Sequence, residues 1–232
     1  MINSLDSINL NFKKSFYKVF NKPELIQPYL HKRSDQFDEI IKTEFLRREL
    51  ETDFAIVALG GYGRKELFPS SDIDLSIIQF DAKTKKIEDI KDFIGWLWTL
   101  NVKVGHSVRT IKDIENITKS DLKEFTSYLS HRIMFCKKNK VASLSQDLTK
   151  ISKKWNKTKF FKAKRLEQNN RFQSFDSTEF SLEPDLKESP GCLRDFQTAL
   201  WILEHCFEIH QLQDCVTAKL FSKKEIENIN QS

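Results

Sequence analysis

The residues of this chain best suited to chemistry are two aspartates, Asp72 and Asp74, separated by Ile73. On a β-strand, side chains two positions apart point to the same side and lie roughly 7 Å apart. Two carboxylates in this arrangement repel each other by about 2.5 kcal/mol at an effective dielectric constant of about 20. A divalent cation relieves that repulsion, and Mg²⁺ takes oxygen ligands of this kind. The pair therefore predicts a magnesium site, although a solvated strand face is the simpler explanation of an isolated Asp-x-Asp.

Two glycines upstream favour the magnesium site over the solvated strand face. Gly60 and Gly61 follow the apolar run FAIVAL, and about ten residues separate them from Asp72. Because glycine has no Cβ, the backbone can approach a ligand closely and offer N–H groups to phosphate oxygens. The segment is neither G-x-G-x-x-G nor G-x-x-x-x-G-K-[ST], which excludes two common phosphate loops. A strand, a tight glycine turn and a strand with two aspartates together favour phosphoryl chemistry.

A helix-flanked sheet is expected to position these residues. The apolar run at 54–59 predicts a buried strand, and 72–80 alternates apolar and polar side chains as in a strand with one polar face. A helix at about 86–100 and a third strand at 101–109 continue the α/β pattern.

The remainder of the chain has helical spacing of apolar residues. This holds for residues 1 to about 50 and again beyond about residue 113. Ser189 followed by Pro190 predicts a helix start, as a cap and a first position. One expected apolar stripe consists of Leu122, Phe125, Leu129 and Met134.

The segment GGYGRKELFPSSDIDL resembles the nucleotidyltransferase motif of the DNA polymerase β superfamily, most closely that of the PII-protein uridylyltransferase (GlnD) family. Three further stretches support the narrower resemblance: VGHSVRT at 104–110, FFKAKRLEQNNRF at 160–172 and LEPDLKESPGCLRDFQTALW at 182–201. The resemblance implies an α/β (α+β) fold, with a small mixed sheet flanked by helices and then a helical region. The expected parts are an N-terminal helical segment at 1–50, the nucleotidyltransferase core at 51–115 and a helical region at 116–232.

The resemblance also implies an activity, the Mg²⁺-dependent transfer of UMP from UTP to a tyrosine of the nitrogen-signalling protein PII, with release of pyrophosphate. Gly60 and Gly61 would hold the triphosphate, and Asp72 and Asp74 would be the catalytic, Mg²⁺-binding carboxylates.

Further polar residues are candidates for the same site. Arg64, Lys187 and Arg194 would offset charge on the phosphates. Ser71 would bind phosphate or fix the start of the second strand. His106 and Arg109 are candidates for orienting the site, with a structural polar role as the alternative.

The chain departs from the family in several places. Sites of the polymerase β type usually have a third carboxylate on a later strand, where this chain has Lys103. Cys192 stands where the family commonly has a glycine, and Ser130 where it has a glutamate. Family members continue with an HD-type hydrolase domain and two ACT domains, so the chain is expected to be truncated before them.

Composition limits the classes of partner. The chain has 232 residues, 39% of them hydrophobic, and a net charge of +5. That charge is spread along the sequence and does not call for nucleic acid. No run of apolar residues is long enough to cross a membrane, and the four cysteines form no C-x-x-C pair. A cytoplasmic protein with UTP and PII as partners, no membrane and no nucleic acid, is the expectation.

Two other functions remain open. One is nucleotide transfer to another acceptor, such as a small molecule or RNA. The other is a catalytically degenerate remnant that binds nucleotide or a protein partner, which Lys103 and Cys192 favour.

Overall fold

The structure is a computed structural model that describes residues 12, 14–81, 83–176 and 185–231. It divides into two compact units, Met1–Ile151 and Ser152–Ser232, and each is described by itself.

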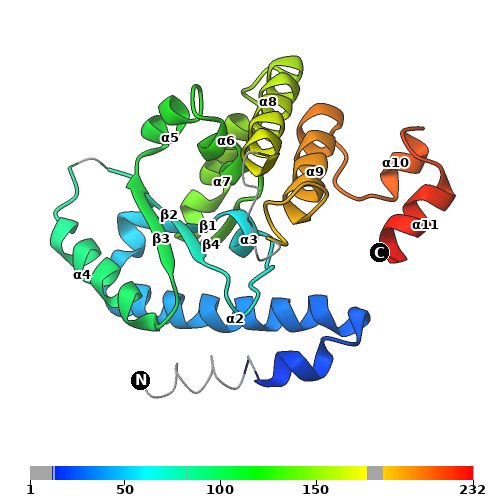
Figure 1. The fold of residues 1–232 in the computed structure, drawn as a ribbon. Helices are drawn as coiled ribbons and strands as arrows, with labels where there is room; N and C mark the ends of the chain where they lie inside the picture. The colour runs from blue at the N-terminus through cyan, green and yellow to red at the C-terminus, as the bar shows by residue number, and fades with distance from the viewer. Residues whose placement is uncertain (1–11, 13, 82, 177–184, 232) are drawn as a thin grey trace. The chain divides into compact units, whose positions relative to one another are not determined.

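The first unit is built on a four-stranded mixed sheet (Figure 1). Its strands are β1 (Phe54–Ala58), β2 (Ile73–Gln79), β3 (Val104–Arg109) and β4 (Arg132–Phe135), in the order β3-β2-β1-β4. β1 is antiparallel to both β2 and β4, whereas β3 runs parallel to β2. All five residues of β1 are buried, as expected for a central strand made only of apolar residues. The predicted fold class, a small mixed sheet flanked by helices, is confirmed.

One face of the sheet packs against two long helices, α2 (Pro23–Arg47) and α4 (Ile87–Leu97). Pro23 is the first residue of α2, where its missing N–H costs no helical hydrogen bond. The core on this face joins both helices to β1 and β2, and it includes Phe37, Ile41, Phe45, Ile56, Ile73, Leu75, Ile77, Ile90, Phe93 and Leu97. Each such side chain contributes roughly 1.5–3 kcal/mol when it is fully buried.

The opposite face is covered by three further helices: α5 (Ile111–Ile117), α6 (Leu122–Leu129) and α7 (Val141–Ser152). Their core residues Ile114, Tyr128 and Leu148 pack with Val57 and Ile78 of the sheet. The sheet is therefore a buried layer, in keeping with the α/β layering expected from the sequence.

The strand β4 corrects a prediction. Met134 was expected in a helical stripe, but it lies in β4. This strand pairs with β1, and the register of the pairing shifts between Ile56 and Val57. Four residues are too few to show a period, and the strand is formed by pairing with a distant segment. This pairing extends the sheet beyond residue 115, and the division at 1–50, 51–115 and 116–232 stays a prediction.

The second unit is helical. Its helices α8 (Lys157–Asp176) and α9 (Leu193–Phe207) pack together through Phe160 and His205, whose ring centroids are 4.6 Å apart. The second unit also contains α10 (Asp214–Thr217) and α11 (Lys223–Gln231). The first unit also contains the short helices α3 (Gly60–Gly63), η1 (Leu50–Thr52), η2 (Trp98–Leu100) and η3 (Lys138–Lys140).

The start of α9 differs from the prediction. Ser189 and Pro190 lie in a turn, and the helix begins at Leu193 with Cys192 as its N-cap. Gly191 has φ +78°, which a right-handed α-helix does not accommodate, and its N–H donates to the Asp195 carboxylate at 2.6 Å.

In the described part of the chain, no helix combines the length and apolar character that a membrane span requires.

Candidate active site

The two aspartates lie at the start of β2. Ile73 and Leu75 are buried in the core beneath α2 and α4, and strand alternation turns Asp74 to the opposite face, where it is exposed. Asp72 directly precedes the strand, and its side chain is 41% exposed. The burial of the alternate apolar residues therefore holds both carboxylates at one end of the sheet.

Two glycines enclose the carboxylate of Asp74. A Cβ on Gly105 would lie 2.6 Å from Asp74 Oδ1, and a Cβ on Gly60 would lie 3.6 Å from Oδ2. Gly105 is the direct partner of Asp74 in the β2–β3 register. Its missing side chain provides the space that the Asp74 carboxylate occupies.

The glycine segment forms one helical turn, α3, where the sequence suggested a simple tight turn. Leu59 is extended and starts it, and its N–H donates to Asp74 O at 2.9 Å, which joins the turn to β2. Within the turn, Gly63 N–H donates to Leu59 O and Arg64 N–H to Gly60 O. The first N–H groups of such a turn have no acceptor within it. Gly60 has φ +56°, a conformation that favours glycine.

A polar network fixes the turn to the surrounding elements. The Tyr62 hydroxyl donates to Asp38 Oδ1 of α2 at 2.7 Å, and Arg132 of β4 donates to Asp38 Oδ2 at 2.6 Å. Arg132 also donates to the carbonyl oxygens of Tyr62 and Gly63. Burial raises the pKa of Tyr62 well above its usual value, and the charge of Asp38 adds to the effect. Tyr62 is therefore a neutral hydrogen-bond donor that anchors the turn.

Close packing adds a second constraint. A Cβ on Gly63 would lie 1.9 Å from Ser130 O, a backbone atom that directly follows α6. Only glycine fits at this contact.

Arg64 and Ser71 lie near the turn with partners of their own. Arg64 Nη2 is 2.7 Å from Glu66 Oε2, and Nη1 donates to Ser130 Oγ at 3.2 Å. The same Nη2 is 4.0 Å from the position of a Cβ on Gly61, so its charge lies beside the glycine turn. Ser71 Oγ accepts from Phe68 N–H at 3.1 Å and closes the turn that leads into β2. Phosphate binding by these two residues stays a prediction.

Lys103 contacts one of the two aspartates directly. Its Nζ lies 2.9 Å from Asp72 Oδ2. The hydrogen bond to Asp72 raises the pKa of Lys103, and the charge of Asp74 contributes a smaller part. The residue in the place of the expected third carboxylate is thus a cation near both aspartates.

His106 and Arg109 lie outside this cluster. His106 follows Gly105 and points to the other face of β3, where its ring centroid is 5.7 Å from that of Trp98. Arg109 forms two hydrogen bonds to Glu124, at 2.6 and 2.9 Å, and ties β3 to α6. These contacts favour the structural alternative for both residues.

Lys187 and Arg194 belong to the second unit. Lys187 is exposed in the turn before α9, and its carbonyl oxygen accepts from Arg194 N–H at 2.8 Å. Arg194 Nη2 is 2.8 Å from Glu188 Oε1, and Nη1 donates to Gln197 at 3.0 Å. Residues 182–184 of the matching sequence block lie outside the described residues. A phosphate role for Lys187 and Arg194 stays a prediction.

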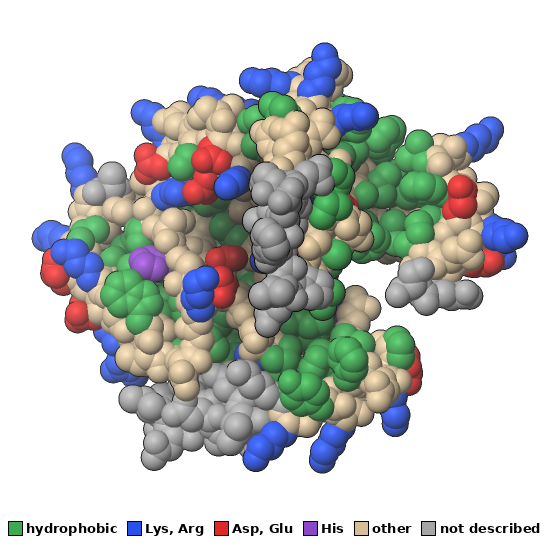
Figure 2. Space-filling view, viewed as in Figure 1, with side chains coloured by type: hydrophobic (Ala, Val, Ile, Leu, Met, Phe, Trp, Pro, Cys, Tyr) green, Lys and Arg blue, Asp and Glu red, His purple; other side chains and the backbone are tan. Residues whose placement is uncertain are grey.

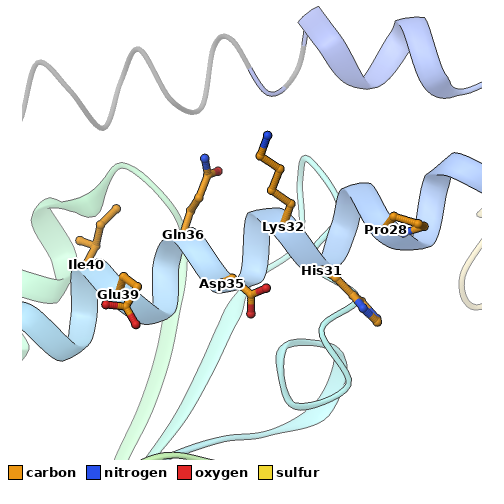
Figure 3. A pocket seen from close by; sticks show the side chains of 7 residues that line it. All are labelled: Pro28, His31, Lys32, Asp35, Gln36, Glu39 and Ile40. Atoms are coloured by element: carbon orange, nitrogen blue, oxygen red, sulfur yellow. The ribbon is translucent and has the colours of Figure 1, made fainter.

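A pocket of about 590 Å³ lies elsewhere, along one helix. All the side chains that line it come from α2, between residues 28 and 40 (Figure 3). Charged side chains of both signs are scattered over the face in Figure 2, with no single basic stripe across it. Neither feature marks a second site of phosphate chemistry.

The donor set at β2 fits a hard divalent cation. Asp72 and Asp74 supply the carboxylate oxygens that such a cation takes, and the exposed Asp74 lies beside the glycine turn. Over the described ranges, no group of three His, Cys, Asp or Glu side chains is placed to hold a metal. The residues therefore provide two carboxylate ligands, and the nucleotide or water would complete the coordination of the metal.

Sequence reasoning missed three residues of this site: Gly105, Asp38 and Arg132. Gly105 lies within the block VGHSVRT, and a glycine inside a strand is the signal for a close approach. Asp38 and Arg132 are 94 positions apart, and no local signal connects them.

Comparison with known proteins finds relatives that match most of this chain. Residues 159–232 match the family model described as GlnD PII-uridylyltransferase. Relatives named bifunctional uridylyltransferase/uridylyl-removing enzyme include that of Haemophilus influenzae, 34% identical over 225 residues, which are 96% of this chain and 25% of the relative. That of Idiomarina loihiensis is 36% identical over 196 residues, 82% of this chain and 22% of the relative. That of Hydrogenovibrio crunogenus is 34% identical over 224 residues, which are 94% of this chain and 25% of the relative. The chain spans about a quarter of the length of these curated relatives.

Proposed function

Because the chain belongs to the GlnD PII-uridylyltransferase family, we propose that it transfers UMP from UTP to a tyrosine hydroxyl of the PII protein. The single observation that supports this most is the position of Asp74. Its carboxylate lies between Gly60 and Gly105, and its carbonyl oxygen accepts from Leu59, where the glycine turn begins. An acidic group and bare backbone meet there, as binding of a cation and a triphosphate requires.

The proposed reaction is an in-line displacement at the α-phosphorus of UTP. The tyrosine oxygen forms a bond to that phosphorus, and the bond from the phosphorus to the oxygen that bridges to the β-phosphate breaks. The bridging oxygen leaves with the electron pair as pyrophosphate, and the hydroxyl proton passes to solvent.

Each residue of the site has a part in this proposal. Asp72 and Asp74 hold Mg²⁺, which when bound offsets negative charge on the phosphate oxygens. Gly60 and Gly61 let the triphosphate approach the backbone, and Arg64 adds positive charge beside them. The Tyr62–Asp38–Arg132 network keeps the turn in place.

Transfer of label tests the proposal. The chain is incubated with Mg²⁺, PII and UTP labelled in the α-phosphate or uridine, and PII is examined for covalent label. Parallel reactions contain ATP, CTP or GTP. We expect label from UTP, and Asp74→Asn should lower the rate roughly a hundredfold or more because one metal-binding charge is lost.

Asp92→Asn is the matched control. Asp92 is exposed on α4, and its replacement makes the same change in charge away from β2. It should leave the rate unchanged, and both variants should keep the melting temperature of the wild-type chain. Label from another nucleotide would show that UTP is not the donor, and label on another acceptor would show that PII is not the target. Triphosphate binding without any transfer would favour the non-catalytic alternative.

A further inference from the structure

The lysine beside Asp72 is placed by the sheet itself. In the parallel register Ile73 pairs with Val104, and Ile73 N–H donates to Lys103 O at 2.8 Å. Continued by one residue, this register sets Lys103 beside Asp72, just as it sets Gly105 beside Asp74. The contact between Lys103 Nζ and Asp72 Oδ2, at 2.9 Å, is therefore a cross-strand pair.

The pair is too exposed to serve mainly stability. The Lys103 side chain is 81% exposed and that of Asp72 is 41% exposed, so solvent screens their attraction. What the ammonium changes is the charge of the site. It cancels one of the two carboxylate charges and leaves less negative charge to attract cations.

The two aspartates have different neighbours. Asp74 borders Gly60 and Gly105, whereas Asp72 borders a cationic side chain. Across the residues that the structure describes, no third His, Cys, Asp or Glu joins these two in a metal-holding group. The site is thus asymmetric, because the positive charge of Lys103 lies beside Asp72 and not between the two aspartates.

We propose, on the basis of the nucleotidyl transfer proposed above, that the site binds one divalent cation in its nucleotide complex. The Lys103 ammonium supplies, beside Asp72, the positive charge that a second cation would otherwise supply. In the nucleotide complex Nζ is shared between Asp72 and a phosphate oxygen.

The number of bound ions tests this directly. The full chain is saturated with uridine 5′-(α,β-imido)triphosphate, which resists cleavage between the α- and β-phosphorus, and bound Mn²⁺ is counted by electron paramagnetic resonance. We expect one Mn²⁺ per complex for the wild-type chain and two for Lys103→Glu, which adds a third carboxylate. Lys103→Met should keep one Mn²⁺ and bind the analogue roughly tenfold more weakly, because a charge-assisted contact is lost. Lys103→Arg should restore that affinity.

Lys91→Glu is the control for charge alone. Lys91 is a 62% exposed residue of α4, and its replacement should change neither the ion count nor the affinity. Two Mn²⁺ in the wild-type complex, one in Lys103→Glu, or none in either would overturn the proposal.

The Mn²⁺ count and the labelling of PII test the two proposals separately. One Mn²⁺ in the wild-type complex and two in Lys103→Glu, without label on PII, would contradict the uridylyl transfer and support the role of Lys103. A chain that labels PII and binds two Mn²⁺ supports the transfer and overturns the role of Lys103.

Discussion

At the scale of single residues, the site depends as much on absent side chains as on present ones. Asp74 keeps its position because Gly105 offers no Cβ at the point that would lie 2.6 Å from Oδ1. No real Cβ contact is that short, so any other residue at 105 must displace the carboxylate.

Replacement of Gly105 by alanine should therefore damage the site more than the fold. We expect a fall in transfer rate of about a hundredfold, the usual result of moving a reacting group by an ångström. Stability should change little, because the displaced atoms are the far end of a flexible side chain. Kinetics and thermal melting of the same preparation give both quantities.

Gly95→Ala is the matched substitution. Gly95 lies in α4 and nothing lies within 4 Å of an added Cβ. It should leave the rate unchanged and raise the free energy of unfolding by about 0.5–1 kcal/mol, since alanine is the better helix former. Equal rates for the two alanine variants would contradict the role given to Gly105.

At the scale of elements, the short turn α3 cannot hold its position by its own hydrogen bonds. One helical turn fixes several dihedral angles for very few bonds and is unstable alone. Its position comes from α2 and β4, through Asp38 and Arg132, and from the close contact of Gly63 with Ser130.

Asp38→Asn should loosen the turn. Asp38 accepts from both Tyr62 and Arg132, so its loss should lower the free energy of unfolding by about 1–3 kcal/mol and raise the KM for UTP. Denaturant unfolding and steady-state kinetics are the measurements.

The control for this prediction lies on the same helix. Asp35 forms a more exposed ion pair with Lys65, at 2.6 Å. Asp35→Asn should lower the free energy of unfolding by at most about 1 kcal/mol and leave KM unchanged. A KM that rises equally in both variants would argue against anchoring by Asp38.

At the scale of the whole molecule, buried titratable groups make stability depend on pH. Burial lowers the pKa of His131 below its ordinary value of 6.5, although a hydrogen bond with Tyr128 O partly opposes the effect. As pH falls, the unfolded chain then binds this proton before the folded chain does. The stability that His131 confers is therefore present above pH 6.5 and is lost as pH falls through the lowered pKa.

Chemical unfolding between pH 8 and pH 5 measures this effect. The wild-type chain should lose stability below about pH 6.5, and His131→Gln should lose less over the same range. Parallel curves for the two proteins would show that other groups cause the acid dependence.

Local patterns of side chains were enough to predict several parts of this protein. The apolar run of β1 and the position of α4 follow from side-chain periodicity, and both are confirmed. The polar face expected for β2 is exposed only at Asp74, because Ser76 and Ile78 on the same face are buried under helices. The family resemblance likewise follows from short motifs, each of them contiguous in the chain.

Contacts between residues far apart in the chain became visible in the folded protein and not before. β4 becomes a strand because β1 offers it an edge, and Gly105 and Lys103 lie beside the two aspartates because β2 and β3 pair in one register. Asp38 and Arg132 join across 94 positions to hold a turn that neither of them borders in sequence. Such contacts depend on long-range pairing and packing, which local periodicity does not encode.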